Sequence, residues 1–257
     1  MDRRTFLLNS TSILFGSLLG QGGLSRAFAF SDGEEKPLPH IALIIDDIGF
    51  SRSLAGKFLD LQVPITYAIL PKLDRSRDLA EEIHAKGHEI MLHQPMEAHN
   101  NKINPGPGAL YVGYEAERIA KVVRENIAGV PFALGINNHM GSRLTECRAE
   151  MNEVLNVVEN QSLFFVDSLT SSRSIAYQEA SRRRIPSAFR NIFLDNFRSE
   201  AYIVNQLRIL EKEAFKYGRA VGIGHPFPET ARAISRVLSE PGNISDYLVH
   251  ISTILKA

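Results

Sequence analysis

The chain has 257 residues, of which 44% are hydrophobic and 23% charged, with 29 basic and 29 acidic side chains. This is the composition of an ordinary globular protein and excludes a disordered or fibrous one. Because the formal net charge is zero, no global electrostatic field favours nucleic acid or an anionic membrane surface as a partner. Cys147 is the single cysteine, so no disulfide can form within the chain.

Residues 1–29 have the composition of a signal peptide. Arg3 and Arg4 precede a short, mildly apolar stretch, and residues 27–29 place small side chains at the spacing of a cleavage site. The paired arginines resemble a twin-arginine signal, although Asp2 stands where such signals carry Ser or Thr. An ordinary secretory signal or an uncleaved anchor is the alternative. We expect an exported protein, periplasmic or extracellular, without an integral membrane domain after cleavage.

Residues 30–40 are polar and contain two prolines, which predicts a short linker before a single domain over residues 41–257. In this domain, apolar runs rich in β-branched residues alternate with helical patterns, as in parallel strands joined by helices. Strands are expected at 41–45, 65–70, 89–93, 133–137, 163–166, 188–194 and 220–223, and 244–255 is a candidate last strand. Helices are expected at 54–61, 74–86, 115–127, 149–160, 175–183, 201–217 and 230–238.

Seven or eight strand–helix units predict an α/β protein with a distorted (β/α)7-type barrel. An open doubly wound sheet usually has fewer units and a phosphate-binding glycine cluster after its first strand, and that cluster is missing from the sequence. Residues 100–113 form a long loop, and loops of this length are often functional. Tyr111 and Tyr114 are candidates for stacking on a sugar; alternatively, they anchor the loop to the barrel.

Polar side chains gather where the expected strands end, at the face of a (β/α) barrel that carries chemistry. They are Asp46 and Asp47 after the first strand, His93 and Glu97 after the third, Asn138, His139 and Ser142 after the fourth, Asp167 and Ser168 after the fifth, Asp195 and Asn196 after the sixth, and His225 after the seventh. Three of the eight histidines lie at these few positions, so we expect one shared site.

The adjacent carboxylates Asp46 and Asp47 leave a buried strand, where a charge is costly unless it is paired or bound to a metal. One could ligate a cation while the other acts as a base; alternatively, the pair caps the following helix. His93 and His139 are candidate metal ligands, with a hydrogen-bonded core histidine as the alternative for each. His225 is a candidate general acid or a turn residue.

One carboxylate and two imidazoles suit Zn²⁺, and Fe, Co, Ni or Mn fit the same donors. Such a metal polarises an acyl carbonyl and lowers the pKa of its bound water. With Asp46 accepting a proton and His225 protonating the leaving amine, this set predicts amide hydrolysis.

Five segments resemble the successive motifs of the divergent polysaccharide deacetylase family, a branch of the NodB-like carbohydrate deacetylases. They are residues 44–49, 93–97, 138–142, 165–168 and 222–226. The resemblance implies a distorted (β/α) barrel and a metal-dependent site that removes acetyl groups from a glycan. It also implies that Asp46 is the base, Asp47 and His93 are metal ligands, and His225 is the acid.

One ligand departs from the pattern of the better-known deacetylases, which have a second histidine four residues after the first. Glu97 stands at that spacing from His93, so either Glu97 or His139 completes the ligand set. We favour His139, because Pro95 should disrupt a helical turn that would bring His93 and Glu97 onto one face. Glu97, Asn138, Ser142, Asp167 and Ser168 are candidates to line the site.

Three functions are compatible with this sequence. The leading one is a metal-dependent hydrolase that removes N- or O-acetyl groups from an envelope or extracellular glycan. The second is a catalytically weak or inactive barrel that binds a glycan or an envelope protein, which the departure at Glu97 favours. The third keeps the metal but hydrolyses a different bond, because a fold does not fix a function.

Overall fold

The structure, a computed structural model, describes residues 38–255. The expected signal peptide (1–29) and residues 30–37 of the expected linker lie outside the described residues. His40 is the first residue of the first strand, so the sheet begins one residue before the expected domain boundary. Between residues 38 and 255, no helix has the length and apolar character needed to cross a bilayer.

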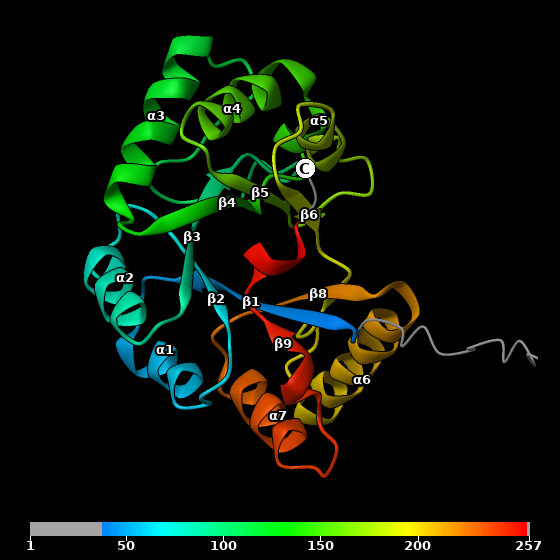
Figure 1. Cartoon of the computed structure of the whole chain (residues 1–257). Coiled ribbons are helices and arrows are strands. Elements are labelled where there is room, and N and C mark those ends of the chain that lie inside the picture. Colours follow the sequence, from blue (N-terminus) through cyan, green and yellow to red (C-terminus); the bar gives the residue numbers. More distant parts are fainter. Residues whose placement is uncertain (1–37, 256–257) are drawn as a thin grey trace, which may run out of the picture. The chain divides into compact units, whose positions relative to one another are not determined.

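The strands form one parallel sheet that curls around the centre of the domain (Figure 1). They are β1 (His40–Ile48), β2 (Thr66–Ile69), β3 (Glu89–Met96), β4 (Ala133–Met140), β5 (Phe164–Asp167), β6 (Ser187–Phe189), β7 (Ile192–Phe193), β8 (Arg219–Gly224) and β9 (Leu248–Val249). Their order is β6-β5-β4-β3-β2-β1-β8-β7, and β9 pairs with β1. The expected distorted α/β barrel is therefore confirmed, in the form of a curled half-barrel.

The α-helices alternate with the strands and cover the outside of the curled sheet (Figure 1). They are α1 (Arg52–Leu59), α2 (Ser76–Ala85), α3 (Ala116–Gly129), α4 (Arg148–Asn160), α5 (Ala176–Arg182), α6 (Glu200–Tyr217) and α7 (Pro228–Leu238). Local signals explain several ends: the Ser51 side chain caps α1, Pro228 is the first residue of α7, and Gly218, with φ +80°, ends α6. Each expected helix is present to within two residues.

The expected strand over 188–194 is wrong as a single element, because the chain changes its partner in the middle. β6 pairs with β5, and β7 pairs with β8. Between them, the Arg190 amide donates to the Asp167 carbonyl and the Asn191 amide donates to the Val221 carbonyl. Arg190 and Asn191 therefore form a seam between the two sides of the sheet, and this seam distorts the barrel.

The core has two layers. The larger layer lies between the strands and the helices. The smaller layer fills the inside of the curled sheet and draws on strands and the C-terminal segment: Ala42, Ile44, Ala68, Met91, Phe164, Val166, Val221, Ile223, Ile251 and Ile254. Because strand side chains alternate between the two sides, each strand has an inward and an outward row.

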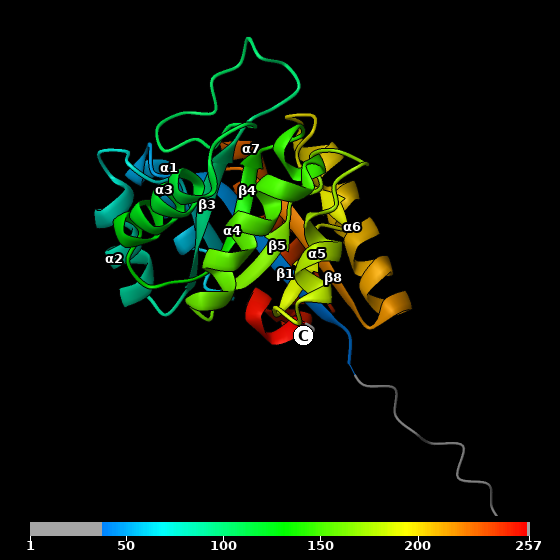
Figure 2. The same cartoon turned by 90° about the horizontal axis from the view of Figure 1, so that it is seen from above.

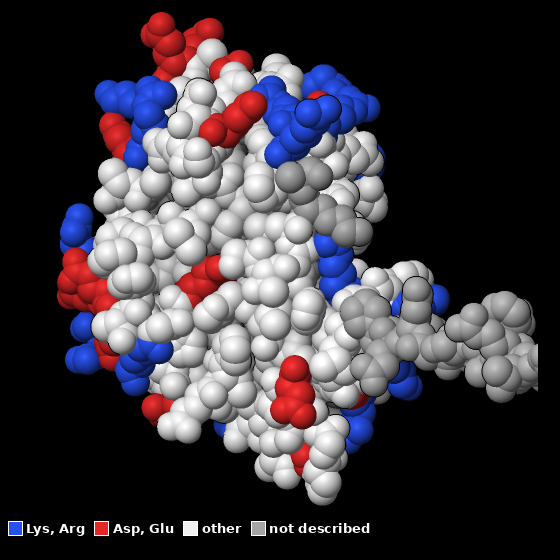
Figure 3. All heavy atoms as spheres, viewed as in Figure 1, with Lys and Arg blue, Asp and Glu red and all other residues white. Residues whose placement is uncertain are grey.

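The candidate last strand over 244–255 is present only as the two-residue β9. This segment consists of two short 3₁₀ helices, Ile244–Tyr247 and Ile251–Ile254, on either side of β9. It closes the end of the barrel where the strands begin, because the Ile251 amide donates to Thr66 Oγ1 and the Ser252 amide donates to Glu89 Oε1. On this closed face, charged side chains lie mainly at the periphery (Figure 3).

The long loop between β3 and α3 projects at the opposite end, where the strands finish (Figure 2). Buried amides hold its base: Gln94 Nε2 donates to the Gly108 carbonyl, and Asn126 Nδ2 donates to Gln94 Oε1. The Tyr111 and Tyr114 rings lie 5.6 Å apart in this loop. The loop is thus fixed beside the open end of the barrel.

Candidate metal centre

The inward row of each strand carries the candidate site residues. In β1, Ala42 and Ile44 face the interior, and Asp46 continues the same row. In β3, Met91 faces the interior and His93 follows it two residues later. Both polar side chains are 2% exposed, so they lie on top of the inner core rather than in solvent.

Strands β4 and β8 supply the remaining inward residues. In the β3–β4 register, His93 is opposite Asn137, and Pro95 is opposite His139. In β8, Val221 and Ile223 face the interior, and His225 comes two residues after Ile223. The inward residues of these four strands therefore converge where the strands end.

Asp47 reaches this site because the backbone is irregular there. In a regular strand it would face outward with Leu43 and Ile45, which belong to the outer core. Instead, Asp47 has φ +56° and the β1–β2 register shifts between Ile45 and Ile48. A positive φ is uncommon for any residue but Gly, with Asp and Asn among the better tolerated.

Asp47, His93 and His139 form a cluster whose ligand atoms all lie within 4.8 Å of one another. Asp47 Oδ1 is 2.9 Å from His139 Nδ1 and 3.2 Å from His93 Nε2, and the two imidazole nitrogens are 3.1 Å apart. Asp47 Oδ1 is nevertheless a buried atom that accepts no hydrogen bond of normal geometry from any group of residues 38–255. A cation between the three atoms would satisfy all of them.

Asn137 fixes the protonation of His93. Its amide nitrogen donates to Asp46 Oδ1 over 2.7 Å, which turns its oxygen toward His93 Nδ1, also at 2.7 Å. His93 must therefore carry its proton on Nδ1, and in the neutral ring Nε2 presents a lone pair to Asp47 and His139. A hydrogen bond of this kind on the remote nitrogen is typical of metal-binding histidines. The residues present thus fit a divalent metal.

The environment pushes the pKa values of the two adjacent carboxyl groups apart. Burial raises the pKa of Asp46, and the lowering effects of His93 and His225 do not offset it. Burial also raises the pKa of Asp47, but the close imidazole nitrogens of His139 and His93 and their charges outweigh it and hold this pKa well below its usual range. Neighbouring acids separated in this way commonly take different roles in catalysis.

A second imidazole–carboxylate pair, formed by His225 and Asp195, lies beside the cluster. His225 Nδ1 is 2.8 Å from Asp195 Oδ1, and Asp195 Oδ2 accepts from the His225 amide and from Thr230 Oγ1. Burial lowers the pKa of His225, but the hydrogen bond and charge of Asp195 outweigh it and raise the pKa to about 9. No role for Asp195 was expected, although its position at a strand end signalled one.

The His225 ring lies in a stack of aromatic and guanidinium groups. The Phe193 and Phe227 rings stack on it with centroids 6.0 and 5.6 Å away. Arg190 lies over Phe193 at 3.8 Å, and Arg198 lies over Phe227 at 3.7 Å. These contacts fix the plane of the imidazole, and the bond to Asp195 fixes its rotation, so Nε2 is held in one direction.

An apolar pocket of about 200 Å³ opens beside Asp47. It is lined by Asp47, Ile48, Gly49, Phe50, Ser51, Leu54, Pro226 and Phe227. The pocket therefore lies between the turn that follows β1 and the turn that follows His225. It gives the metal cluster an apolar neighbour in which part of a substrate can be held.

Glu97 is engaged away from the cluster. Its Oε1 accepts from Arg143 Nη1 over 2.6 Å, and its Oε2 accepts from the Val112 amide over 2.7 Å. The structure thus brings His139, and not Glu97, to Asp47 and His93. Pro95 lies in strand β3, so no helical turn brings His93 and Glu97 onto one face.

Two of the expected lining residues support loops around the site. Asn138 Oδ1 accepts from the Ser168 amide over 2.9 Å, and Ser142 Oγ accepts from the His99 amide over 3.0 Å. The Ser168 hydroxyl is buried and has no hydrogen-bond partner among residues 38–255. Asn138 and Ser142 therefore hold the loops that surround the cluster.

Asp167 faces away from the barrel interior, in the outward row of Phe165. Its carboxylate accepts from Ser174 Oγ over 2.6 Å and from the Leu169 and Tyr177 amides. The side chain is fully buried, and burial raises its pKa. Asp167 therefore shapes the loop between β5 and α5 and lies outside the metal cluster.

Replacing Asn137 with Leu should lower the metal affinity about 10- to 100-fold, the usual cost of losing a group that orients a metal-binding histidine. Leucine has a similar shape but leaves His93 Nδ1 and Asp46 Oδ1 without their partner. Competition with a chromogenic chelator measures the change. Asn138→Leu is the matched control, since its amide faces the Ser168 loop, and equal losses in both variants would contradict the role of Asn137.

The fold and the cluster together define a curled α/β half-barrel with a carboxylate–imidazole centre at the C-terminal ends of its strands. Residues 43–255 match the family described as divergent polysaccharide deacetylase. The chain belongs to this family, which confirms the resemblance found in its motifs.

Two of the proteins that this chain is similar to are named as uncharacterized. Protein YibQ of Escherichia coli K12 is 32% identical over 216 residues, which cover 84% of this chain and 67% of YibQ. The crystal structure of ATU2773 from Agrobacterium tumefaciens C58 aligns with a TM-score of 0.79 at 24% identity, covering 86% of this chain and 91% of that one. This second likeness shows the fold.

The fold also occurs in a protein named for an activity. The structure of the Bc1960 peptidoglycan N-acetylglucosamine deacetylase aligns with a TM-score of 0.50 at 15% identity, covering 84% of this chain and 88% of that one. At this identity the likeness shows a shared architecture alone.

Proposed function

We propose that this protein is a divalent-metal-dependent hydrolase that removes acetyl groups from a glycan. The observation that carries the proposal is the convergence of the Asp47, His93 and His139 ligand atoms. The buried carboxylate of Asp46 and the His225–Asp195 pair lie beside this cluster, so a base and an acid accompany the ligands. A metal ligand set with both proton-transfer groups is what acyl hydrolysis requires.

The three ligands would hold Zn²⁺ or a similar ion, which when bound supplies a Lewis acid for an acyl carbonyl and for water. Asp46 has one oxygen fixed by Asn137, while its Oδ2 lies 3.7 Å from His93 Nε2, on the side of the cluster. Its raised pKa makes it a stronger base than an ordinary Asp. Asp46 therefore accepts the proton of the attacking water.

His225 is the general acid in this proposal. With Nδ1 bonded to Asp195, its Nε2 is the nitrogen that can donate. A pKa of about 9 keeps the ring protonated at neutral pH, so a proton is available for the leaving amine or alkoxide. The stack of Phe193 and Phe227 keeps the donor direction constant during the transfer.

A glycan of the cell envelope is the proposed substrate. The family description names polysaccharide deacetylation, and Bc1960, which shares the fold, is named for action on peptidoglycan N-acetylglucosamine. The signal-like residues 1–29 support export to the periplasm or cell surface, by the twin-arginine route. We therefore propose that the protein acts outside the cytoplasm.

Two measurements on protein without residues 1–29 test this function: metal content by elemental mass spectrometry, and acetate release from N-acetylglucosamine oligomers. We expect nearly one metal per chain and acetate release, both lost in Asp47→Asn. Asn suits this test because it tolerates the left-handed backbone of Asp47. A folded protein that takes up no added metal would refute the proposal.

The second candidate function is a glycan-binding barrel with little or no activity. The observation in its favour is that Glu97, at the position of the expected second histidine, is bound to Arg143 and Val112. In that case the protein would bind the oligomers but release no acetate, whether or not metal is present.

The rate of acetate release should fall as the pH rises through about 9, because His225 must be protonated to act as the acid. Since its pKa lies above the ordinary 6.5, His225 also contributes stability that is fully present below pH 6.5 and lost as the pH rises through about 9. Asp195→Asn should move both effects to lower pH. The pH profile of kcat/KM and the ring NMR shifts measure this, and an unmoved basic limb would show that another group sets it.

A further inference from the structure

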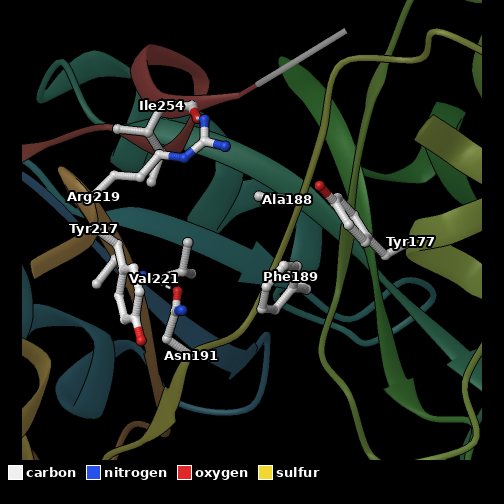
Figure 4. Close-up of a pocket in the computed structure, with 9 residues that line it drawn as sticks. Tyr177, Ala188, Phe189, Asn191, Tyr217, Arg219, Val221 and Ile254 are labelled. Atoms are coloured by element: carbon white, nitrogen blue, oxygen red, sulfur yellow. Dashed lines mark hydrogen bonds between the residues drawn. The ribbon is translucent and has the colours of Figure 1, made fainter. Parts of the chain in front are cut away.

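A second pocket, of about 340 Å³, lies at the seam of the barrel (Figure 4). It is lined by Tyr177, Ala188, Phe189, Asn191, Tyr217, Arg219, Ala220, Val221 and Ile254. The pocket is separate from the metal cluster: Arg219 begins β8, whereas His225 follows its last residue. Ile254 belongs to the segment that closes the opposite end of the barrel.

The pocket exists because the strands diverge here. β6 stays beside β5 as far as Phe189, and the chain reaches β8 only at Asn191, whose amide donates to the Val221 carbonyl. The first residues of β8 therefore have no neighbouring strand on this side. The seam leaves a wedge-shaped opening that small residues such as Ala188 do not fill.

Aromatic rings form two walls of the seam pocket. On one side, the Tyr177 and Phe189 rings meet edge to face with centroids 4.9 Å apart, and Tyr217 stands on the other side (Figure 4). Phe189 is 38% exposed and Tyr217 is 61% exposed. Leaving such rings in water is unfavourable, and flat exposed rings that face a pocket commonly stack on a ligand.

The seam pocket also contains the cationic side chain of Arg219. Arg219 donates from Nη1 to the Ile254 carbonyl, and no carboxylate of residues 38–255 forms an ion pair with it. Its guanidinium and the Tyr177 hydroxyl are directed into the open space (Figure 4). A guanidinium and a hydroxyl that converge in this way suit a carboxylate.

We propose that the seam pocket binds a saccharide unit that carries a carboxylate. The apolar face of the sugar ring would stack on Phe189, and the carboxylate would bind Arg219 with help from Tyr177. The volume of the pocket is in the range of small-ligand sites, with aromatic walls and few polar groups. A glycan held here would remain at a high effective concentration around the protein, independently of the metal centre.

Calorimetric titration of protein without residues 1–29 with a uronic acid disaccharide tests this site. We expect saturable binding, at least about tenfold weaker for the same disaccharide with reduced carboxyl groups, because a charge-assisted bond is lost. Phe189→Ala should weaken binding about tenfold by removing the stacking ring. Arg219→Gln should weaken binding to a similar extent. Tyr177→Phe removes the hydroxyl at the same end of the pocket and leaves the bond between Arg219 and the Ile254 carbonyl intact.

Two controls separate this site from other surfaces. Phe132→Ala removes a 48% exposed ring that stacks on His84 outside the seam pocket, so binding should be unchanged. His139→Ala disrupts the metal cluster and should also leave binding unchanged, so the result does not depend on the proposed activity. Absent binding, equal binding of the reduced disaccharide, or equal effects of Phe189→Ala and Phe132→Ala would overturn the proposal.

Discussion

Replacing His139 with Ala is expected to lower the metal affinity at least about 100-fold, beyond the effect of losing an orienting group. The ring contributes one of three ligand atoms, with Nδ1 2.9 Å from Asp47 Oδ1 and 3.1 Å from His93 Nε2. Two ligands that remain on separate strands cannot enclose the ion. Metal content and chelator competition measure the loss.

Glu97→Gln is the matched control for this prediction. Glu97 stands at the spacing of the expected second histidine, but its carboxylate binds Arg143 and the Val112 amide. The Gln variant should keep the metal and lose some thermal stability as the charge on Arg143 loses its partner. Loss of metal from Glu97→Gln together with retention by His139→Ala would reverse the assignment.

The strand pattern predicts most of the site because one rule governs it. Side chains two residues apart share a face, so Asp46 follows Ile44 and His225 follows Ile223 toward the interior. The same rule excludes Asp167 from the interior site, because Asp167 lies on the same outward face of β5 as Phe165. The prediction that Asp167 lines the site is based on its position at a strand end and does not consider which face of the strand it occupies.

Other features depend on contacts between distant segments and could not be predicted from local sequence. Asp47 joins the cluster through a left-handed backbone conformation, which its local sequence does not predict because the residue itself is not Gly. The division of 188–194 into β6 and β7 depends on the pairing of Asn191 with Val221. Local strand propensity does not predict this pairing. Likewise, Glu97 is occupied by Arg143, 46 residues away.

Asp46 and Asp47 show how adjacent residues of one type acquire separate roles. Asp46 is almost completely buried and one of its oxygens is bonded to a neutral amide, so burial dominates and raises its pKa. Asp47 lies beside two imidazoles, which lower its pKa by more than burial raises it. One carboxylate is thereby suited to accept a proton, and the other to remain charged beside a cation.

Asp46→Asn should therefore reduce the rate of acetate release about 10²- to 10⁴-fold, the usual contribution of a general base. The variant keeps the shape of the side chain, and its amide oxygen can still accept from Asn137 Nδ2. Because Asp46 is not one of the three clustered ligands, metal content should be unchanged. The loss should appear in kcat rather than in KM.

Measuring kcat and metal content on the same sample of Asp46→Asn separates the roles of this carboxylate. A metal-loaded variant with low kcat means that the carboxylate acts in proton transfer. Loss of the metal would make Asp46 a fourth ligand, since its Oδ2 lies 3.7 Å from His93 Nε2. Unchanged kcat would remove Asp46 from the reaction and leave the proton of the attacking water to another group.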